Sequence, residues 1–485
     1  MVIAWWVLQI IYAAIVITVC FRIIYDTQSY SKSLAYLLFV ILIPIIGIIF
    51  YLSFGINYRK RKMYSKKLST DEELSKKMRQ QILEHSDATY KNSKSFLKDY
   101  KKLINMITND TMSTISGNNR VKLLYNGEKK FPEVIKSLKS AKHHIHIEYY
   151  IYENDTIGNQ IVDVLIEKAL EGVEVRFIFD DFGSRAVRGK MLRRLREAGV
   201  MVYPFHRVIF IYFANRINYR NHRKIIIVDG QDAFVGGINV SDKYINHPDD
   251  SHIYWRDTHL QIKGKAVYFL QRTFMCDWNF CAKDNLAPTL DYFPAPESFD
   301  TNDNKVVQIV ASGPDSPVPT ILYSLLQAMN LAKEEILITT PYFIPGESIM
   351  DALIVAALGG VKVKLLVPGV SDSRFVNAAA RSYYNDLVRA GVEIYVYQKG
   401  FVHAKTLVID GKVAVVGTAN MDYRSFDLNF EVNAIVYDEE TAAELSAVFY
   451  QDLQESDYID PERWLNRSRV SQLLEKTARL VSPLL

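Results

Sequence analysis

The strongest constraint on the fold is a string of residues that occurs twice, once from His222 and again from His403. In both copies a lysine follows the histidine by two residues, an aspartate follows the lysine by five, and an asparagine follows the histidine by seventeen. The other members are Lys224, Asp229 and Asn239 in the first string and Lys405, Asp410 and Asn420 in the second. One short pattern arises easily by chance, but two with equal spacing indicate an internal duplication.

Each string predicts a strand that ends in a tight turn. The residues between the lysine and the aspartate are β-branched or leucine, which favours a strand. Side chains two residues apart share one face of a strand, so each histidine is expected beside its lysine. Asp229-Gly230 and Asp410-Gly411 are hairpin-turn pairs. Gly236-Gly237 and Gly417-Thr418 then supply small residues where a ligand can approach the backbone.

The segments before the two strings also follow one order. The expected helices are 131–140, 158–170 and 187–198 in the first copy, and 320–332, 348–358 and 374–390 in the second. The expected strands are 144–150, 173–180 and 200–205, and then 336–340, 361–368 and 392–397. This alternation predicts an α/β fold, with two pseudo-symmetric sandwich halves that form one catalytic unit.

Two apolar runs at the N-terminus, Val2–Ile24 and Leu34–Phe54, are each long enough to cross a bilayer as a helix. A cleaved signal peptide fits less well, because no basic residue precedes the first run and a second run follows at once. Basic residues are concentrated at 59–67, whereas the loop at 25–33 carries only Asp26 and Lys32. We therefore expect a multi-pass protein of the cell membrane whose catalytic domain faces the cytoplasm.

These patterns divide the chain into six parts. They are a two-helix membrane anchor (1–58), a polar helical connector (59–118), the first half (119–281), a linker (282–304), the second half (305–460) and an amphipathic tail (461–485).

Composition narrows the functional class. With 49% hydrophobic residues among 485, the chain is not predominantly disordered. Its 58 basic and 54 acidic residues lack the basic excess of a nucleic-acid-binding protein, so no nucleic-acid partner is expected. Three cysteines cannot cross-link a chain of this length, which favours a reducing compartment.

The two strings together predict an anion site. Two lysines and the amides of Asn239 and Asn420 can donate hydrogen bonds to the nonbridging oxygens of a phosphate, more strongly as negative charge develops. One histidine can attack phosphorus, and the other can protonate the leaving oxygen. The symmetry of the strings does not reveal which histidine does which.

The paired strings resemble the HxKxxxxD motifs of the phospholipase D superfamily, and the wider sequence resembles the bacterial cardiolipin synthases. The supporting segments are the two N-terminal apolar runs, Asn221-His222, Gly236-Gly237-Ile-Asn239, Gly417–Ser425, Asn429-Phe-Glu431 and the terminal Ser482-Pro-Leu-Leu. The resemblance implies that two phosphatidylglycerols give cardiolipin and glycerol through a phosphohistidine, with no metal or other cofactor. Anionic membrane lipids are the implied partners.

The resemblance also implies residue roles. His222 would be the nucleophile, and His403 the acid and then the base. A carboxylate after each motif would orient a histidine through its other ring nitrogen. Glu431 matches that position in the second half, and Asp257 is the best candidate in the first.

Other motif positions carry weaker expectations. Asp229 and Asp410 complete the catalytic motifs, but we expect them to hold the turn and the motif lysine rather than to react. Many superfamily members have serine where this chain has Gly237 and Thr418. Threonine keeps a hydroxyl, while Gly237 loses that contact.

Three further features each allow two interpretations. Glu148 matches a position near the pocket of related enzymes, or makes a structural contact. Together with His144 and His146 it also offers metal-ligand side chains, although a strand presents ligands in a row rather than around an ion. The apolar stretch 208–218 is either a buried strand or a lip that contacts acyl chains. Residues 463–485 form a basic amphipathic helix that lies on an anionic membrane or covers a neighbouring domain.

The leading hypothesis is therefore a phosphatidyltransferase of the cardiolipin synthase type. A membrane-anchored phospholipase D that hydrolyses or exchanges head groups is the alternative, since only the acceptor differs. A nuclease and a non-catalytic scaffold fit the composition and the intact motifs less well. The sequence does not predict the donor lipid, the use of phosphatidylethanolamine or the oligomeric state.

Overall fold

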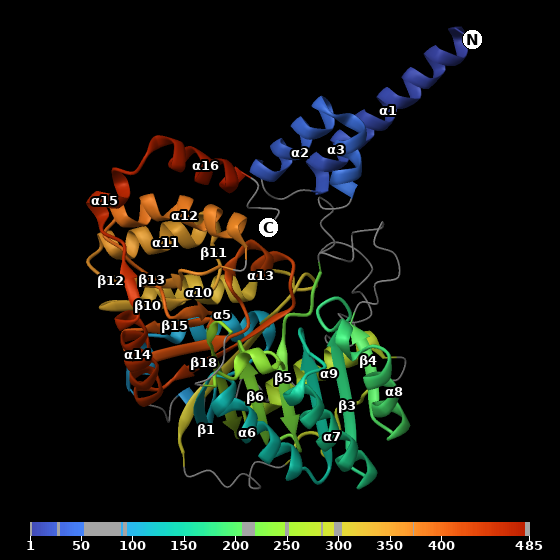
Figure 1. Cartoon of the computed structure of the whole chain (residues 1–485), viewed down its shortest axis with the longest axis vertical. Helices are drawn as coiled ribbons and strands as arrows, with labels where there is room; N and C mark the ends of the chain where they lie inside the picture. The colour runs from blue at the N-terminus through green and yellow to red at the C-terminus, as the bar shows by residue number, and fades with distance from the viewer. Residues whose placement is uncertain are drawn as a thin grey trace.

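The computed structural model describes residues 2–26, 30–52, 89–90, 95–205, 219–247, 252–282, 285–294, 303–371 and 373–480. The basic segment 59–67, the apolar stretch 208–218 and the terminal Ser482-Pro-Leu-Leu lie outside these ranges, as do most of the predicted connector and part of the linker. Figure 1 shows two α/β bodies side by side, with the first helix extending away from them.

Fifteen described strands form one sheet that runs through both bodies. The first half contributes β1 (Ser116–Tyr125), β2 (His144–Tyr149), β3 (Glu174–Asp180), β4 (Met201–Phe205), β5 (Lys224–Val228), β6 (Asp232–Gly236) and β8 (Thr258–Lys263). The second contributes β9 (Lys305–Ser312), β10 (Glu335–Thr339), β12 (Lys362–Pro368), β13 (Glu393–Tyr397), β15 (Thr406–Ile409), β16 (Val413–Gly417), β18 (Glu431–Tyr437) and β19 (Ser456–Tyr458).

The two halves meet where β1 pairs antiparallel with β9. Outward from this junction the order is β8, β6, β5, β2, β3, β4 on one side and β18, β16, β15, β10, β12, β13, β19 on the other. The motif strands β5 and β15 have matching neighbours. β5 lies between its hairpin partner β6 and β2, which pairs in parallel with β3; β15 lies between its hairpin partner β16 and β10, which pairs in parallel with β12.

The expected helices are present with small shifts of their ends. The first half has α6 (Asn126–Lys139), α7 (Thr156–Leu170), α8 (Lys190–Glu197) and α9 (Val267–Cys281). The second has α10 (Thr320–Leu331), α11 (Gly346–Leu358), α12 (Arg374–Arg389), α13 (Tyr423–Asp427), α14 (Glu439–Gln454), α15 (Pro461–Leu465) and α16 (Arg469–Leu480), while α5 (Lys101–Thr111) precedes β1.

One hydrophobic core is shared by both halves. Phe274 and Trp278 of α9 and Leu445 and Phe449 of α14 belong to a single buried cluster with residues of the motif strands. Because interiors are closely packed, such a core holds β5 and β15 in fixed relative positions. Two short two-stranded sheets, β7 (Tyr254–Arg256) with β14 (Gly400–Val402) and β11 (Phe343–Ile344) with β17 (Met421–Asp422), complete the arrangement.

The N-terminal part differs from the expectation of two equal membrane spans. Of the described helices, α1 (Val2–Asp26) contains one stretch, Trp5–Tyr25, that is long and apolar enough to cross a membrane. The second apolar run is divided into α2 (Tyr30–Leu42) and α3 (Pro44–Phe50). The division falls at Pro44, whose ring and missing N–H interrupt a helix.

Candidate active site

Each motif histidine is fixed by the backbone of the opposite half. His222 lies directly before β5 and donates its N–H to the carbonyl of Phe430, 2.9 Å away. His403 lies between β14 and β15 and donates its N–H to the carbonyl of Arg256, at 2.7 Å. β14 also pairs in parallel with β7 of the first half. These reciprocal contacts bring the two motifs to one site.

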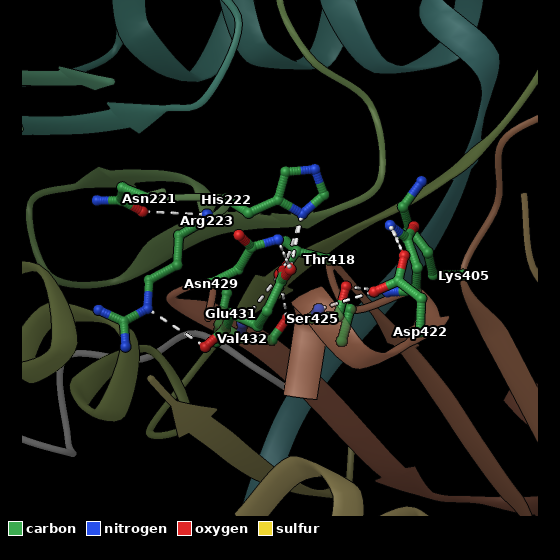
Figure 2. Close-up of polar contacts among 12 residues, drawn as sticks. Asn221, His222, Arg223, Lys405, Thr418, Asp422, Ser425, Asn429, Glu431 and Val432 are labelled. Atoms are coloured by element: carbon green, nitrogen blue, oxygen red, sulfur yellow. Dashed lines mark hydrogen bonds and ion pairs between the residues drawn. The ribbon is translucent and has the colours of Figure 1, made fainter. Parts of the chain in front are cut away.

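The carboxylates that orient the histidines are exchanged between the halves. Nδ1 of His222 lies 2.9 Å from the carboxylate of Glu431, and Nδ1 of His403 lies 2.7 Å from Oδ2 of Asp257. Both carboxylates are fully buried. A carboxylate at Nδ1 favours the tautomer that carries its proton there and leaves the free electron pair on Nε2. At His403, Nζ of Lys405 also lies 3.0 Å from Nδ1. Figure 2 shows the other ring nitrogen of His222 pointing away from Glu431.

Burial keeps both imidazoles neutral in this structure. It lowers the pKa of His222 to about 4, against the opposing effect of Glu431. It lowers the pKa of His403 to about 3, and the charge of Lys405 adds to that effect. A neutral imidazole has the free electron pair that a nucleophile needs.

The motif lysines bind the backbone of their own histidines. Nζ of Lys224 donates to the carbonyl of His222 at 2.7 Å, and Nζ of Lys405 donates to the carbonyl of His403. Burial lowers the pKa of Lys224 to about 7, and the nearby charge of Lys405 acts in the same direction. Each lysine also lowers the pKa of the other half's histidine, so the two cations face a common site.

The difference between Gly237 and Thr418 has a steric cause. The hydroxyl of Thr418 donates to Glu431 at 2.5 Å and so helps to hold the partner of His222 (Figure 2). A Cβ atom at Gly237 would lie 2.1 Å from Oδ1 of Asp257. The carboxylate of Asp257 thus occupies the space that a side chain at 237 would need.

The two motif asparagines lie in the site but already have protein partners. Nδ2 of Asn239 donates to the hydroxyl of Tyr244 at 2.8 Å, and the Tyr244 ring lies 6.1 Å from that of His403. Nδ2 of Asn420 donates to Asp422 at 3.1 Å. An amide nitrogen has two N–H donors, so each asparagine has a second one for a ligand.

The motif aspartates bind backbone N–H groups of the segments that lead into β2 and β10. The Asp229 carboxylate accepts backbone N–H groups of residues 142–144, and that of Asp410 accepts those of residues 333–335. Both aspartates have φ of 52°, in the left-handed region that asparagine and aspartate tolerate. Because a strand is extended, each aspartate lies at the end of its motif strand that is remote from the motif histidine.

Glu148 makes a buried polar network beside His222. Asn221 donates to its carboxyl group, while Arg223 pairs with Asp277 of α9. Burial, and next the charge of Asp277, raise the pKa of Glu148 well above its usual range. The network holds the residues on both sides of His222.

A metal site on β2 is not formed by the side chains considered for it. Nδ1 of His146 lies 2.8 Å from Nε2 of Gln271, and its ring stacks on Phe274. Within the described ranges no group of three His, Cys, Asp or Glu side chains could hold a metal ion.

Three neighbours of the site were missed by sequence reasoning. Tyr150 lies against His222 with ring centroids 4.8 Å apart, and Trp255 lies 5.4 Å from His403. Lys130, fully buried, donates to the carbonyl of Ile238 at 2.7 Å and supports the segment before Asn239. Tyr150 lies two residues after Glu148 and Trp255 two residues before Asp257, whereas Lys130 directly precedes the expected helix 131–140 and no pattern marks it.

The chain is similar to known proteins over nearly its full length. It matches the family described as cardiolipin synthase, PLD-like domain, over residues 134–278 and 325–453, and the phospholipase D-nuclease N-terminal family over residues 10–55. It is 39% identical over 480 residues to a cardiolipin synthase of Alkalihalophilus pseudofirmus, covering 99% of this chain and 94% of that protein. It is 40% identical over 465 residues to the major cardiolipin synthase of Bacillus subtilis, covering 95% of each.

A solved structure with a similar fold is the phosphatidylserine synthase of Haemophilus influenzae. The TM-score is 0.59 at 14% identity, covering 80% of this chain and 100% of that chain. This similarity concerns the fold alone.

Proposed function

The chain belongs to the cardiolipin synthase family with phospholipase D-like domains, and from this premise we propose that it transfers a phosphatidyl group from one phosphatidylglycerol to another. Cardiolipin and glycerol are the products. The observation that carries the proposal is the pair of histidines, each held by a buried carboxylate of the opposite half. We further propose that the two halves are pseudo-symmetric parts of one catalytic unit.

The first step forms a phosphohistidine. Nε2 of His222 attacks phosphorus, and the bond from phosphorus to the head-group glycerol oxygen breaks. His403 gives its proton to that oxygen, and glycerol leaves. In the second step His403 takes the proton from a glycerol hydroxyl of the second phosphatidylglycerol, whose oxygen attacks phosphorus and breaks the bond to His222.

The charge of the substrate explains how His403 obtains its proton. In the empty site burial and Lys405 keep His403 neutral. A bound phosphodiester brings a negative charge next to the lysines, which raises the pKa of a nearby imidazole. Lys224, Lys405 and the two asparagine amides then donate to the nonbridging oxygens as charge develops on them. Asp229 and Asp410 shape the motif without touching the substrate.

The test is product analysis by mass spectrometry after incubation of the full chain with phosphatidylglycerol vesicles. We expect cardiolipin and glycerol in equal amounts. Phosphatidic acid as the main product would identify a hydrolytic phospholipase D instead. His222→Ala and His403→Ala should both abolish transfer, and only His222→Ala should prevent a phosphoenzyme; normal turnover in either variant contradicts the mechanism.

We also propose that α1 and the α2–α3 segment together anchor the chain as two membrane crossings, with both chain ends in the cytoplasm. The apolar surface of α1 and the match of residues 10–55 to the phospholipase D-nuclease N-terminal family support this. A reporter that is active only outside the cytoplasm, fused to the C-terminus, should be inactive. An active reporter would reverse the orientation.

A further inference from the structure

The last described helix, α16, has an apolar outer face that packs on nothing in the described structure. Its four large apolar residues are strongly exposed: Val470 (68%), Leu473 (65%), Leu474 (66%) and Leu480 (80%). Residues spaced by three, four and seven positions lie on one side of a helix. We call these four residues the α16 outer face.

The opposite side of α16 is already bound to the body. Glu475 and Ala478 are buried, and the Glu475 carboxylate accepts from Arg467 at 2.9 Å and from Arg381 of α12 at 3.0 Å. Nδ2 of Asn385 donates to Gln472 at 3.3 Å. These contacts fix the rotation of the helix, so the outer face cannot turn inward onto α12.

The charges around the outer face are positive. Arg469 and Lys476 are exposed, while the acidic Glu475 is neutralised by two arginines on the inner side. A second copy of the chain docked face to face would bring like charges together, which opposes pairing. An anionic bilayer is favoured, because it accepts apolar side chains and attracts the cations beside them.

The position of α16 agrees with a bilayer as its partner. Figure 1 shows α16 and the N-terminal helices at the top of the view, while α7 lies at the bottom. α16 therefore lies at the end of the molecule from which α1 extends, the helix that we propose crosses the membrane. We propose that α16 lies parallel to the surface of an anionic bilayer, with its outer face among the head groups and upper acyl chains. This contact is independent of the phosphatidyl transfer.

The experiment places an environment-sensitive fluorophore, NBD, on Leu474→Cys in the full chain. The matched control is Leu170→Cys at the end of α7, a leucine that is 73% exposed. The labelled unsubstituted chain measures the background from Cys20, Cys276 and Cys281. The chain is reconstituted into phosphatidylcholine vesicles with and without phosphatidylserine, and lipids with a doxyl group on the upper acyl chain serve as quencher.

With phosphatidylserine present, the label at 474 should emit at shorter wavelength and lose most of its intensity to the quencher. The label at 170 should do neither. Arg469→Gln with Lys476→Gln should weaken quenching at 474 in the anionic vesicles. The proposal is overturned if 474 resembles 170, if both are quenched equally, or if 474 shifts in wavelength without quenching, which would indicate a protein contact.

Discussion

Gly237→Ala should slow phosphatidyl transfer by displacing a carboxylate that never touches the substrate. The added Cβ would lie 2.1 Å from Oδ1 and 2.9 Å from Cγ of Asp257. Real Cβ contacts below 3.0 Å are essentially never seen, so the carboxylate must retreat by roughly 1 Å. Asp257 is buried and short, and its Oδ1 accepts the N–H of Thr258 at 2.7 Å, so it has little freedom to adjust elsewhere.

The size of the expected decrease in kcat/KM follows from the hydrogen bond between Asp257 and His403 that is lost. The distance from Asp257 Oδ2 to Nδ1 of His403 is 2.7 Å, and a retreat of roughly 1 Å takes it beyond the limit of about 3.5 Å for a hydrogen bond. A hydrogen bond to a charged group is worth about 1.5–3 kcal/mol. Since each 1.36 kcal/mol is a factor of ten, we expect kcat/KM to fall about 10-fold to 150-fold.

The assay is the initial rate of cardiolipin formation from phosphatidylglycerol, with thermal unfolding as the check on folding. Gly117→Ala is the matched control, because its Cβ would meet Thr89 and Asn304 only at 3.5 and 3.8 Å. If Gly237→Ala acts through Asp257, it should cost little further activity in an Asp257→Asn background. Full activity of folded Gly237→Ala, or losses that multiply in the double variant, would refute the reasoning.

Three other outcomes follow from the same geometry. Because the pKa of His222 is lowered to about 4, phosphoenzyme formation in rapid-quench experiments should decline on the acid side only below about pH 5, and an acid-side midpoint near neutrality would contradict the burial argument. Asp229→Ala should lower the free energy of unfolding by about 1.5–3 kcal/mol through loss of the turn contacts, with turnover of the folded enzyme nearly unchanged; a larger loss of turnover than of stability would make Asp229 catalytic. The pKa of Glu148 is raised in the folded state, so its carboxyl group stays protonated there, and the stability that this proton contributes is lost as pH rises through the folded-state pKa. Glu148→Gln should therefore become more stable to heat relative to the parent as pH increases. A difference in melting temperature that stays constant with pH would show that the carboxyl group is ionised in the folded protein.

Sequence reasoning predicted the parts of the site that depend on local pattern. The motif strands, their turns and the pairing of each histidine with its lysine follow from β-branched residues, Asp-Gly pairs and the two-residue repeat of a strand. The exchange of carboxylates could not be predicted in this way. His222 and Glu431 are 209 positions apart in the sequence. The periodicity of apolar residues does not predict which distant segments come into contact when the shared core forms.

The other differences between the sequence-based prediction and the structure also have physical causes. Asp277 lies on a mainly apolar helix, so its pairing with Arg223 appears only once α9 is packed behind β5. Arg223 is the residue from which this ion pair could have been predicted, because a charged side chain in a buried segment needs a partner of opposite charge. The pattern of the second apolar run predicts one helix, whereas Pro44 divides the run into α2 and α3.

Each motif histidine is held by a carboxylate of the opposite half, so neither half by itself contains a histidine together with the acidic residue that orients it. Within each half the residue beside the carboxylate fits it: Gly237 leaves room for Asp257, and the hydroxyl of Thr418 donates to Glu431. Separated fragments of this protein should therefore regain chemistry only when mixed.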